Sequence, residues 1–564
     1  MRRMMPSWLV PILLGALALR VWGITTGLPE LYWHDETGTL LGSLRIGVTG
    51  LRGAGYSYFH GTFLSLLLFA AEAAYYVVGR LTGMFTSLND FLLRFASDPS
   101  GCVILVRAVL VAVSTGVVAL TYALGERLVD RTTGLIAALG AAASFGFVQL
   151  AFGKEDQLYT LLLLGSVWAL VRSLETGLKP AGLLASGLLL GLATGVKYLA
   201  LLGGIFLVVA WWWHRDRLSP GRLLIWGIGF LGGLLAGIPA LLVDPLTVWR
   251  DASQVYGANT SHGFLVIEGL NTSWLSYAGP TIADNVGMVL AVACGAGLLR
   301  CIRRRDGRLL SWLLAYPLVL TIVLARVVWF GQGNAVPYFQ LPAVPFLLIL
   351  AALGIRDALE SPRRAARATG LAVLCAGVLA NAPPIVRYKR WLASDDTRTL
   401  AKTWLEARAP AGSRIAVEGG LKGYIWAGPQ LAEDDATLQR EIARSKQEGG
   451  TGRFWEERAR ALNRSAAPRY TLTKVVRVSE LTEEQLRTHD YVVLSRRYDE
   501  PWTALPSFEP VERFEPTPPI SYDFAPMLSR TDLSHLRAVP LWGSSRLAKG
   551  PRIVILRRTA PGPG

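Results

Sequence analysis

Cysteine and charge are both scarce in this sequence. Only 17% of the 564 residues are Asp, Glu, Lys or Arg, whereas about 25% is usual for a soluble globular protein. The cysteines lie in or beside apolar runs: they are Cys102, Cys294, Cys301 and Cys375. This placement predicts neither a disulfide framework nor a cysteine-based metal site. A small-residue cleavage site is also missing after the first apolar run, so that run is not expected to be a removable signal peptide.

Hydrophobic residues are abundant instead, at 52% of the chain. Apolar stretches of about 20 residues, the length that crosses a bilayer core, recur from Pro6 to Pro384. The net charge of +16 comes from basic residues in the short loops between these stretches, where they indicate orientation in a membrane. No motif is typical of nucleic-acid binding. The sequence therefore predicts a polytopic α-helical membrane protein that contacts membrane lipids and no nucleic acid.

The basic loops also predict which side of the membrane each loop faces. Arg2 and Arg3 precede the first span, which predicts a cytoplasmic N-terminus. The later basic loops share that side if segment 58–83 is a juxtamembrane or re-entrant segment without a net crossing. Segments 29–57 and 244–282 are then the long outer loops. The predicted spans, about eleven in number, are 6–28, 101–125, 133–152, 157–171, 180–196, 198–213, 223–243, 283–299, 309–325, 337–353 and 368–383.

The chain changes character near residue 385. Residues 1–385 are predicted to form the transmembrane domain, and residues 386–564 a soluble α/β domain on the outer side. An amphipathic helix is predicted at 397–409 and a charged helical stretch at 434–462. Strands are predicted at 414–418, 470–478, 491–494 and 552–556. The C-terminal domain carries no catalytic motif, so a lid, an acceptor-docking surface and a structural support all stay open as its role.

An adjacent acidic pair, Asp35 and Glu36, follows the first apolar run. Ionisable residues at the edge of a bilayer are costly and mark candidate functional sites, although an exposed loop would also tolerate them. The predicted topology brings 154–156 (Lys-Glu-Asp) and Lys197-Tyr198 to the same outer face, and His60 and Arg326 join them. Long basic side chains can reach the interface simply because their stems are apolar. Short carboxylates cannot do so, which favours a functional role for the acidic residues.

Carboxylates beside cations on the outer face suit glycosyl transfer from a polyprenyl-phosphate sugar. The leaving group is a phosphate, so no general acid is needed, and one carboxylate can deprotonate the attacking acceptor hydroxyl. Cations or a divalent metal ion would hold the departing phosphate. Direct displacement by the acceptor would invert the anomeric carbon.

The segment Leu31–Thr37 (LYWHDET), placed after a first span, resembles the acidic motif in the first periplasmic loop of GT-C glycosyltransferases. The closest likeness is to the bacterial family 39, or PMT-like, group that contains the aminoarabinose transferase and the protein O-mannosyltransferase relatives. Further segments are similar to that family in order along the chain: 58–63, 151–156, 191–202, 336–342 and 396–418. Two departures stand out, since no Pro-Pro follows His60 and no arginine precedes Tyr338.

The resemblance implies roles for particular residues. It implies Asp35 as the catalytic base, Glu36 as an orienting residue or metal ligand, and Asp156 as a support for the acceptor or a metal. Successive helix residues point about 100° apart, so the two carboxylates of the acidic pair are expected to differ in role. Residues implied in binding the donor phosphate or substrate are His60, Lys154, Lys197, Arg326 and Tyr338. Further candidates are Glu155 and Tyr198, from their place on the outer face, and His262, from the polar and aromatic outer loop 244–282.

The resemblance also implies the setting of the reaction. The donor would be a polyprenyl-phosphate sugar, and the acceptor a lipid, a glycan or a protein. The active site and the C-terminal domain would face the periplasm from a bacterial inner membrane. Some relatives bind a divalent metal ion, for which His34, Glu36 and His60 are candidate ligands, although no ligand spacing demands one.

Two other classes of function remain open. A transporter or flippase of lipid-linked sugars predicts charges buried within spans and internal repeats, whereas the charges here lie mainly at outer span ends and no repeat is evident. A catalytically inactive membrane scaffold that presents the C-terminal domain is the second alternative.

Overall fold

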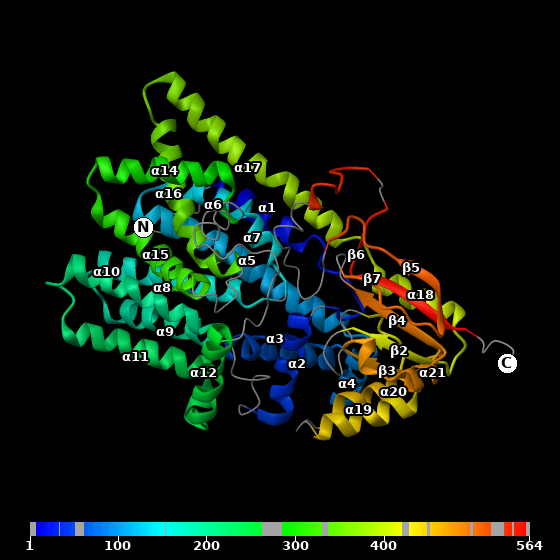
Figure 1. The fold of residues 1–564 in the computed structure, drawn as a ribbon. Helices are drawn as coiled ribbons and strands as arrows, with labels where there is room; N and C mark the ends of the chain where they lie inside the picture. The colour runs from blue at the N-terminus through cyan, green and yellow to red at the C-terminus, as the bar shows by residue number, and fades with distance from the viewer. Residues whose placement is uncertain are drawn as a thin grey trace. The chain divides into compact units, whose positions relative to one another are not determined.

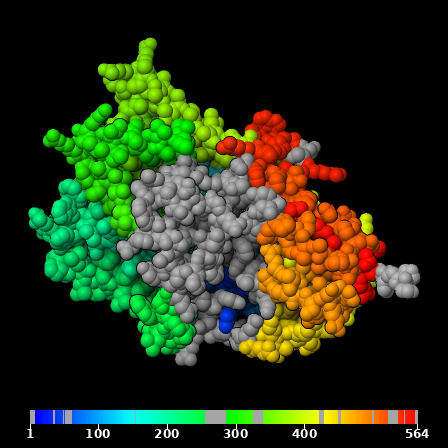
Figure 2. All heavy atoms as spheres, viewed as in Figure 1, coloured from blue at the N-terminus to red at the C-terminus, as the bar shows by residue number. Residues whose placement is uncertain are grey.

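The chain divides into two compact units, which are described separately. A computed structural model describes residues 7–32, 34–50, 61–152, 154–261, 285–329, 337–419, 428–447, 452–496, 500–520, 535–543 and 546–559. The remaining residues are drawn in grey in Figure 2. The first unit comprises Met1–Trp22, Gly38–Ala70 and Arg107–Ile385, and the second comprises Gly23–Thr37, Ala71–Val106 and Val386–Gly564. The second unit therefore combines the C-terminal part of the chain with two N-terminal segments.

The first unit is built from helices (Figure 1). Those that lie wholly or partly in it are α1 (Leu9–Val21), α2 (His34–Thr49), α3 (Phe63–Leu81), α5 (Ser100–Leu128), α6 (Arg131–Ala142), α7 (Phe145–Gln149), α8 (Asp156–Glu175), α9 (Pro180–Val196), η2 (Tyr198–Gly204), α10 (Ile205–His214), α11 (Pro220–Gly237), η3 (Pro239–Leu242), α12 (Pro245–Ser261), α14 (Met288–Arg303), α15 (Gly307–Trp329), η4 (Pro337–Ala343), α16 (Val344–Leu359) and α17 (Arg364–Leu392).

Among the described residues, seven helices are long and apolar enough to cross a membrane. They are Phe63–Leu81, Ser100–Leu128, Asp156–Glu175, Pro220–Gly237, Gly307–Leu324, Phe339–Leu359 and Arg364–Leu392, and shorter apolar helices cover Leu9–Val21, Pro180–Val196 and Tyr198–His214. These helices confirm the predicted class, a polytopic α-helical membrane protein. The count of about eleven spans stays a prediction, because length and composition alone identify these helices. The expectation that segment 58–83 makes no net crossing also stays a prediction, although α3, within that segment, is long enough to span.

The predicted span 133–152 is not a single helix. It is divided into α6 and α7, and the chain between them turns at Ser144, whose backbone is extended with φ −70° and ψ 122°. The Ser144 hydroxyl donates a hydrogen bond to the carbonyl oxygen of Asn285 at 2.5 Å. A serine side chain that bonds a distant backbone group in this way offers an alternative to the helical ladder. Hydropathy alone could not show the break, since both pieces are apolar.

Glycines allow α9 and α11 to pack backbone against backbone. They repeat every fourth residue along α9, at Gly187 and Gly191, and along α11, at Gly229 and Gly233. A Cβ atom on Gly191 would lie 2.1 Å from the carbonyl oxygen of Phe230, and the other glycines of this contact are equally crowded by backbone atoms. Small residues at this spacing are typical of close helix pairs in membranes.

The second unit contains a mixed five-stranded sheet in the order β3-β2-β4-β7-β5. The strands are β2 (Arg414–Glu418), β3 (Thr471–Val475), β4 (Tyr491–Arg496), β5 (Phe508–Phe514) and β7 (Arg552–Arg558). Strand β2 pairs in parallel with β3 and β4, whereas β7 runs antiparallel to β4 and β5. A two-stranded ladder joins β1 (Asp395–Asp396) to β6 (Ala548–Lys549). The four predicted strands are confirmed, and the edge strand β5 is additional.

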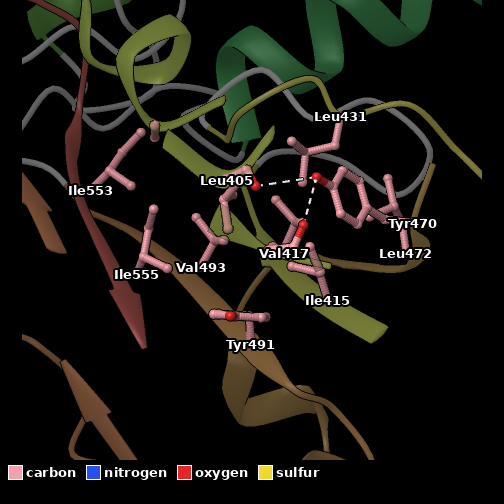
Figure 3. Close-up of a cluster of buried hydrophobic side chains, with 12 residues drawn as sticks. Leu405, Ile415, Val417, Leu431, Tyr470, Leu472, Tyr491, Val493, Ile553 and Ile555 are labelled. Carbon is pink, nitrogen blue, oxygen red and sulfur yellow. Dashed lines mark hydrogen bonds between the residues drawn. The ribbon is translucent and has the colours of Figure 1, made fainter. Parts of the chain in front are cut away.

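Helices cover the sheet and complete the α/β unit. They are α18 (Thr397–Arg408), α19 (Asp435–Gln447), α20 (Arg453–Leu462) and α21 (Glu483–Arg487). Leu405 of α18 packs with Ile415 and Val417 of β2 on one face of the sheet. The hydroxyl of Tyr470 donates to the carbonyl oxygen of Leu405 at 3.2 Å, so the phenol is satisfied inside this core (Figure 3).

The N-terminal segment Ala71–Val106 is attached to the same unit through α4 (Leu88–Ser97). The rings of Phe95 on α4 and Phe454 on α20 lie 6.3 Å apart, in an edge-to-face arrangement. Arg453 also donates to the side-chain oxygen of Asn89 at 3.1 Å. Aromatic packing of this kind stabilises a contact beyond the area it buries.

Candidate active site

A buried cluster of acidic and basic side chains lies at one end of the α8–α9 hairpin in the first unit. The two helices are joined by a short turn in which Gly177 has a φ of +86° and Pro180 starts α9. Because the helices run in opposite directions, the start of α8 and the end of α9 lie at the same end of the hairpin. Asp156 is the first residue of α8 and Lys197 follows the last residue of α9, so residues 41 positions apart meet.

Lys197 holds both acidic residues of this cluster. Its Nζ atom lies 2.8 Å from Oδ1 of Asp156 and 3.1 Å from Oε1 of Glu155. The Asp156 side chain is fully buried, and the Lys197 side chain is only 8% exposed. Charges removed from water in this way are tolerated only when they are paired and hydrogen-bonded. The ring of Phe339 on η4 adds a cation–π contact, with its centroid 4.6 Å from Nζ.

The second carboxylate oxygen of Asp156 has no hydrogen-bond partner within the described ranges. Oδ2 is buried while Oδ1 accepts from Lys197. A buried acceptor without a partner is costly and calls for an explanation. The position of Asp156 in the first turn of α8 lowers part of this cost, because negative charge is favourable at a helix N-terminus. The free oxygen can accept a hydrogen bond from a bound hydroxyl group.

The other predicted residues of this region take different places. Lys154 is buried beside the cluster, and Tyr198 packs against the apolar group formed by Ile238, Ala240 and Val248. The structure thus brings together the two predicted groups 154–156 and 197–198. Lys197, expected from sequence to contact a phosphate, is engaged with two carboxylates.

The acidic pair lies in the second unit, at the start of α2. Asp35 and Glu36 belong to its first turn, and the Glu36 side chain is buried with 2% exposure. The segment that leads to them contacts the C-terminal part of the same unit. Burial, followed by the negative charges of Asp396 and Glu30, raises the pKa of Tyr32 well above its usual range. The Tyr32 phenol therefore stays protonated, and its hydroxyl lies 3.0 Å from Oγ1 of Thr399.

Several predicted residues cannot be placed as site side chains. His60 and His262 lie outside the described residues. Arg326 lies in α15 and Tyr338 in η4, while the side chains of these two residues and of His34 and Asp35 are outside the described part of the structure.

A metal site is not assigned. Within the described ranges, no group of three or more His, Cys, Asp or Glu residues is arranged to hold a metal ion. The Asp156 carboxylate already pairs with an ammonium group through its other oxygen, which disfavours a second cation beside it. Two of the expected ligands, His34 and His60, have side chains outside the described part of the structure, so a bound metal ion stays a prediction.

Sequence reasoning missed the residues that hold the acidic segment, namely Glu30, Arg398, Lys402 and Gln430. Each of the last three contacts a residue more than 360 positions away. The sequence offered one signal for this contact: segment 396–418 and the acidic motif resemble the same family. That similarity does not predict that the two segments touch.

Comparison with known proteins gives one family match. Residues 84–242 match the family described as dolichyl-phosphate-mannose-protein mannosyltransferase. This range contains Lys154, Asp156 and Lys197, whereas the acidic pair precedes it. A search of curated proteins found no match.

Similar solved structures include those of two proteins. The oligosaccharyltransferase of Archaeoglobus fulgidus in the apo form is 14% identical with a TM-score of 0.47, over 72% of this chain and 58% of that one. ArnT from Cupriavidus metallidurans bound to undecaprenyl phosphate is 15% identical with a TM-score of 0.47, over 81% of this chain and 75% of that one. This chain thus spans less than two thirds of the length of the archaeal protein. The family match confirms the resemblance seen in the sequence motifs: residues 84–242 of this chain are similar to the dolichyl-phosphate-mannose-protein mannosyltransferases, a GT-C family.

Proposed function

We propose that this protein transfers a sugar from a polyprenyl-phosphate-linked donor to an acceptor hydroxyl on the outer face of a bacterial inner membrane, with inversion of the anomeric carbon. The observation that carries the proposal is the family match over residues 84–242, which include the buried cluster of Asp156 and Lys197. The match indicates glycosyl transfer from a lipid-phosphate-linked donor as the general reaction. The donor sugar and the acceptor class, whether lipid, glycan or protein, are not specified by it.

In the proposed reaction Asp35 is the general base. Its carboxylate takes the proton of the acceptor hydroxyl while that oxygen bonds to the anomeric carbon. The bond from the anomeric carbon to the phosphate oxygen breaks with its electron pair, and polyprenyl phosphate leaves as an anion. Because phosphate is a good leaving group, this step needs no acid. Attack from the face opposite the leaving group accounts for inversion.

Asp156 is proposed to orient a substrate hydroxyl. Lys197 fixes one oxygen of its carboxylate at 2.8 Å, and the other oxygen is buried without a partner within the described residues. A hydrogen bond to a charged acceptor is stronger than one between neutral groups. A sugar or acceptor hydroxyl that binds there would satisfy Oδ2 and be held in one orientation, which favours reaction.

The transporter alternative stays open. The charges of the Asp156 cluster lie at the first residue of one candidate span and directly after the last residue of a neighbouring helix. A translocation pathway is expected to carry ionisable residues within the spans, and two such residues, Glu72 in α3 and Arg107 in α5, are buried within candidate spans. The scaffold alternative gives no reason for a desolvated carboxylate with an unused oxygen.

Replacing Asp35 by Asn tests the proposal. The purified protein is incubated with undecaprenyl phosphate that carries radiolabelled mannose, glucose or aminoarabinose, with membrane extract as the source of acceptor, and the release of undecaprenyl phosphate is followed. The substitution should lower kcat by about 10²- to 10⁴-fold, which is the usual contribution of a general base. Glu484→Gln on α21, where the side chain is exposed, is the control and should leave turnover unchanged. Turnover at the wild-type rate in Asp35→Asn would refute the assignment.

A further inference from the structure

Residues 26–32, which lead to the acidic pair, contact α18 and the end of α17. Helix α18 is the first helix after α17, the last candidate span. Residues 26–32 and α18 both belong to the second unit. The ammonium of Lys402 lies 2.9 Å from Oε1 of Glu30, and the two side chains are 24% and 7% exposed. Directly after Glu30, the carbonyl oxygen of Leu31 accepts a hydrogen bond from Nε2 of Gln430 at 2.9 Å.

Arg398 is the central residue of this contact. Its guanidinium forms a bidentate salt bridge with Asp396, in which Nε lies 2.7 Å from Oδ1 and Nη2 lies 2.6 Å from Oδ2. The same group lies over the ring of Tyr32, with 3.9 Å between Cζ and the ring centroid. The Arg398 side chain is 1% exposed, so water weakens neither interaction. A planar guanidinium can pair with a carboxylate and stack on a ring at once, which a lysine cannot do.

Asp396 is itself fixed by the fold. Its side chain accepts a hydrogen bond from the backbone N–H of Arg398 at 3.0 Å and thereby caps α18. Its backbone pairs with Lys549 in the β1–β6 ladder. The guanidinium that covers Tyr32 is therefore anchored to two separate elements of the C-terminal part of the chain.

A second anchor lies upstream. The hydroxyl of Thr26 donates to the carbonyl oxygen of Leu392 at 2.9 Å, and Leu392 is the last residue of α17. The acidic segment is thus held at Thr26 and again at 30–32, both times by residues beyond 385. From Tyr32 only three residues lead to Asp35, a reach of at most about 10 Å.

We infer that α18 sets the position of Asp35 and that Arg398 and Lys402 are positioning residues for the transfer reaction, which gives the C-terminal domain a role in catalysis. The inference rests on the proposed function of Asp35. A general base must lie within hydrogen-bond reach of the proton it removes. A displacement of about 1 Å can cost on the order of 10²-fold in rate. The clamp formed by Glu30, Tyr32, Arg398 and Lys402 therefore acts on kcat and leaves donor binding unchanged.

The test compares arginine substitutions at the two ends of α18 in the full-length protein. Arg398→Ala removes the clamp, Arg398→Lys keeps only the charge, and Arg408→Ala, at an exposed position of the same helix, is the matched control. The rate of hydrogen–deuterium exchange in the peptide 23–37 shows whether the clamp still holds this segment, and the measurement does not depend on activity. Turnover of the undecaprenyl-phosphate sugar that the wild type uses fastest reports the consequence.

We expect faster exchange of 23–37 and a fall in kcat on the order of 10- to 100-fold at an unchanged donor KM in both Arg398 variants, with neither change in Arg408→Ala. Charge reversal gives a milder test at a partly exposed pair. Glu30→Lys and Lys402→Glu should each lower kcat, and the double variant should restore it. A support that acts only on stability would not produce this rescue.

The inference is overturned if exchange of 23–37 is the same in Arg398→Ala and in the wild type. It is also overturned if exchange rises while kcat stays at the wild-type value, or if the double charge reversal is no better than the single ones. Failure of the proposed function is recognised separately, because Asp35→Asn would then retain full turnover while the exchange measurement still reports the clamp.

Discussion

Replacing Lys197 by Met tests whether the buried ion pairs of this residue stabilise the protein. The substitution removes an ammonium that lies 2.8 Å from Asp156 and 3.1 Å from Glu155, whose side chains are 0% and 13% exposed. Removing one partner of a buried ion pair leaves an uncompensated charge and costs about 3–5 kcal/mol. Total stabilities are about 5–15 kcal/mol, so a fall of several degrees in the thermal midpoint is expected.

The double variant Lys197→Met with Asp156→Asn should recover part of this loss, because no buried carboxylate is then left at position 156. Lys446→Met is the matched control, since Lys446 and its partner Glu456 are 55% and 40% exposed. It should change stability by less than about 1 kcal/mol. The measurement is thermal unfolding in detergent, followed by intrinsic fluorescence. A Lys197→Met midpoint equal to that of the wild type would refute the reasoning.

Two further predictions concern packing and pH. Gly191→Leu should lower the thermal midpoint strongly, because the Cβ atom of the new side chain would lie 2.1 Å from a backbone oxygen of α11. Gly232→Ala on α11 is the control and should be tolerated, because a Cβ atom there would meet open space. Burial alone would raise the pKa of Glu433, but the charges of Arg458 and Lys474 lower it from 4.5 to about 2. Since the pKa in the folded state lies below that in the unfolded state, the carboxylate contributes about 3 kcal/mol above pH ~4.5, and this is lost as the pH falls towards 2. Glu433→Gln should therefore flatten the loss of stability between pH 4.5 and 2 in a thermal-unfolding series, and an unchanged slope would contradict the assignment.

Much of the architecture could be predicted because it depends on local pattern. The amphipathic stretch 397–409 is helix α18, and the alternating or apolar runs at 414–418 and 491–494 are central strands. The edge strand β5 was missed, since Glu509 and Arg513 are exposed and Pro510 lies between them. Edge strands tolerate such residues, and they therefore resemble loops in sequence.

The candidate site was predictable only in part. A short turn between two helices returns Lys197 to Asp156, and this follows from the lengths of two neighbouring apolar runs. The clamp on the acidic segment could not be inferred in that way, because Glu30 and Lys402 are 372 positions apart. A contact of that kind depends on how the C-terminal sheet and the N-terminal segment fold together in one unit.

The most direct measurement of the central claim is the configuration of the transferred sugar. Purified protein is given an undecaprenyl-phosphate sugar of known anomeric configuration with membrane extract as the source of acceptor, and the product linkage is determined by nuclear magnetic resonance. We predict a glycoside of the opposite anomeric configuration, together with release of undecaprenyl phosphate that Asp35→Asn slows by about 10²- to 10⁴-fold. A product that retains the donor configuration, or donor that is moved across vesicles without cleavage, would contradict the proposed reaction.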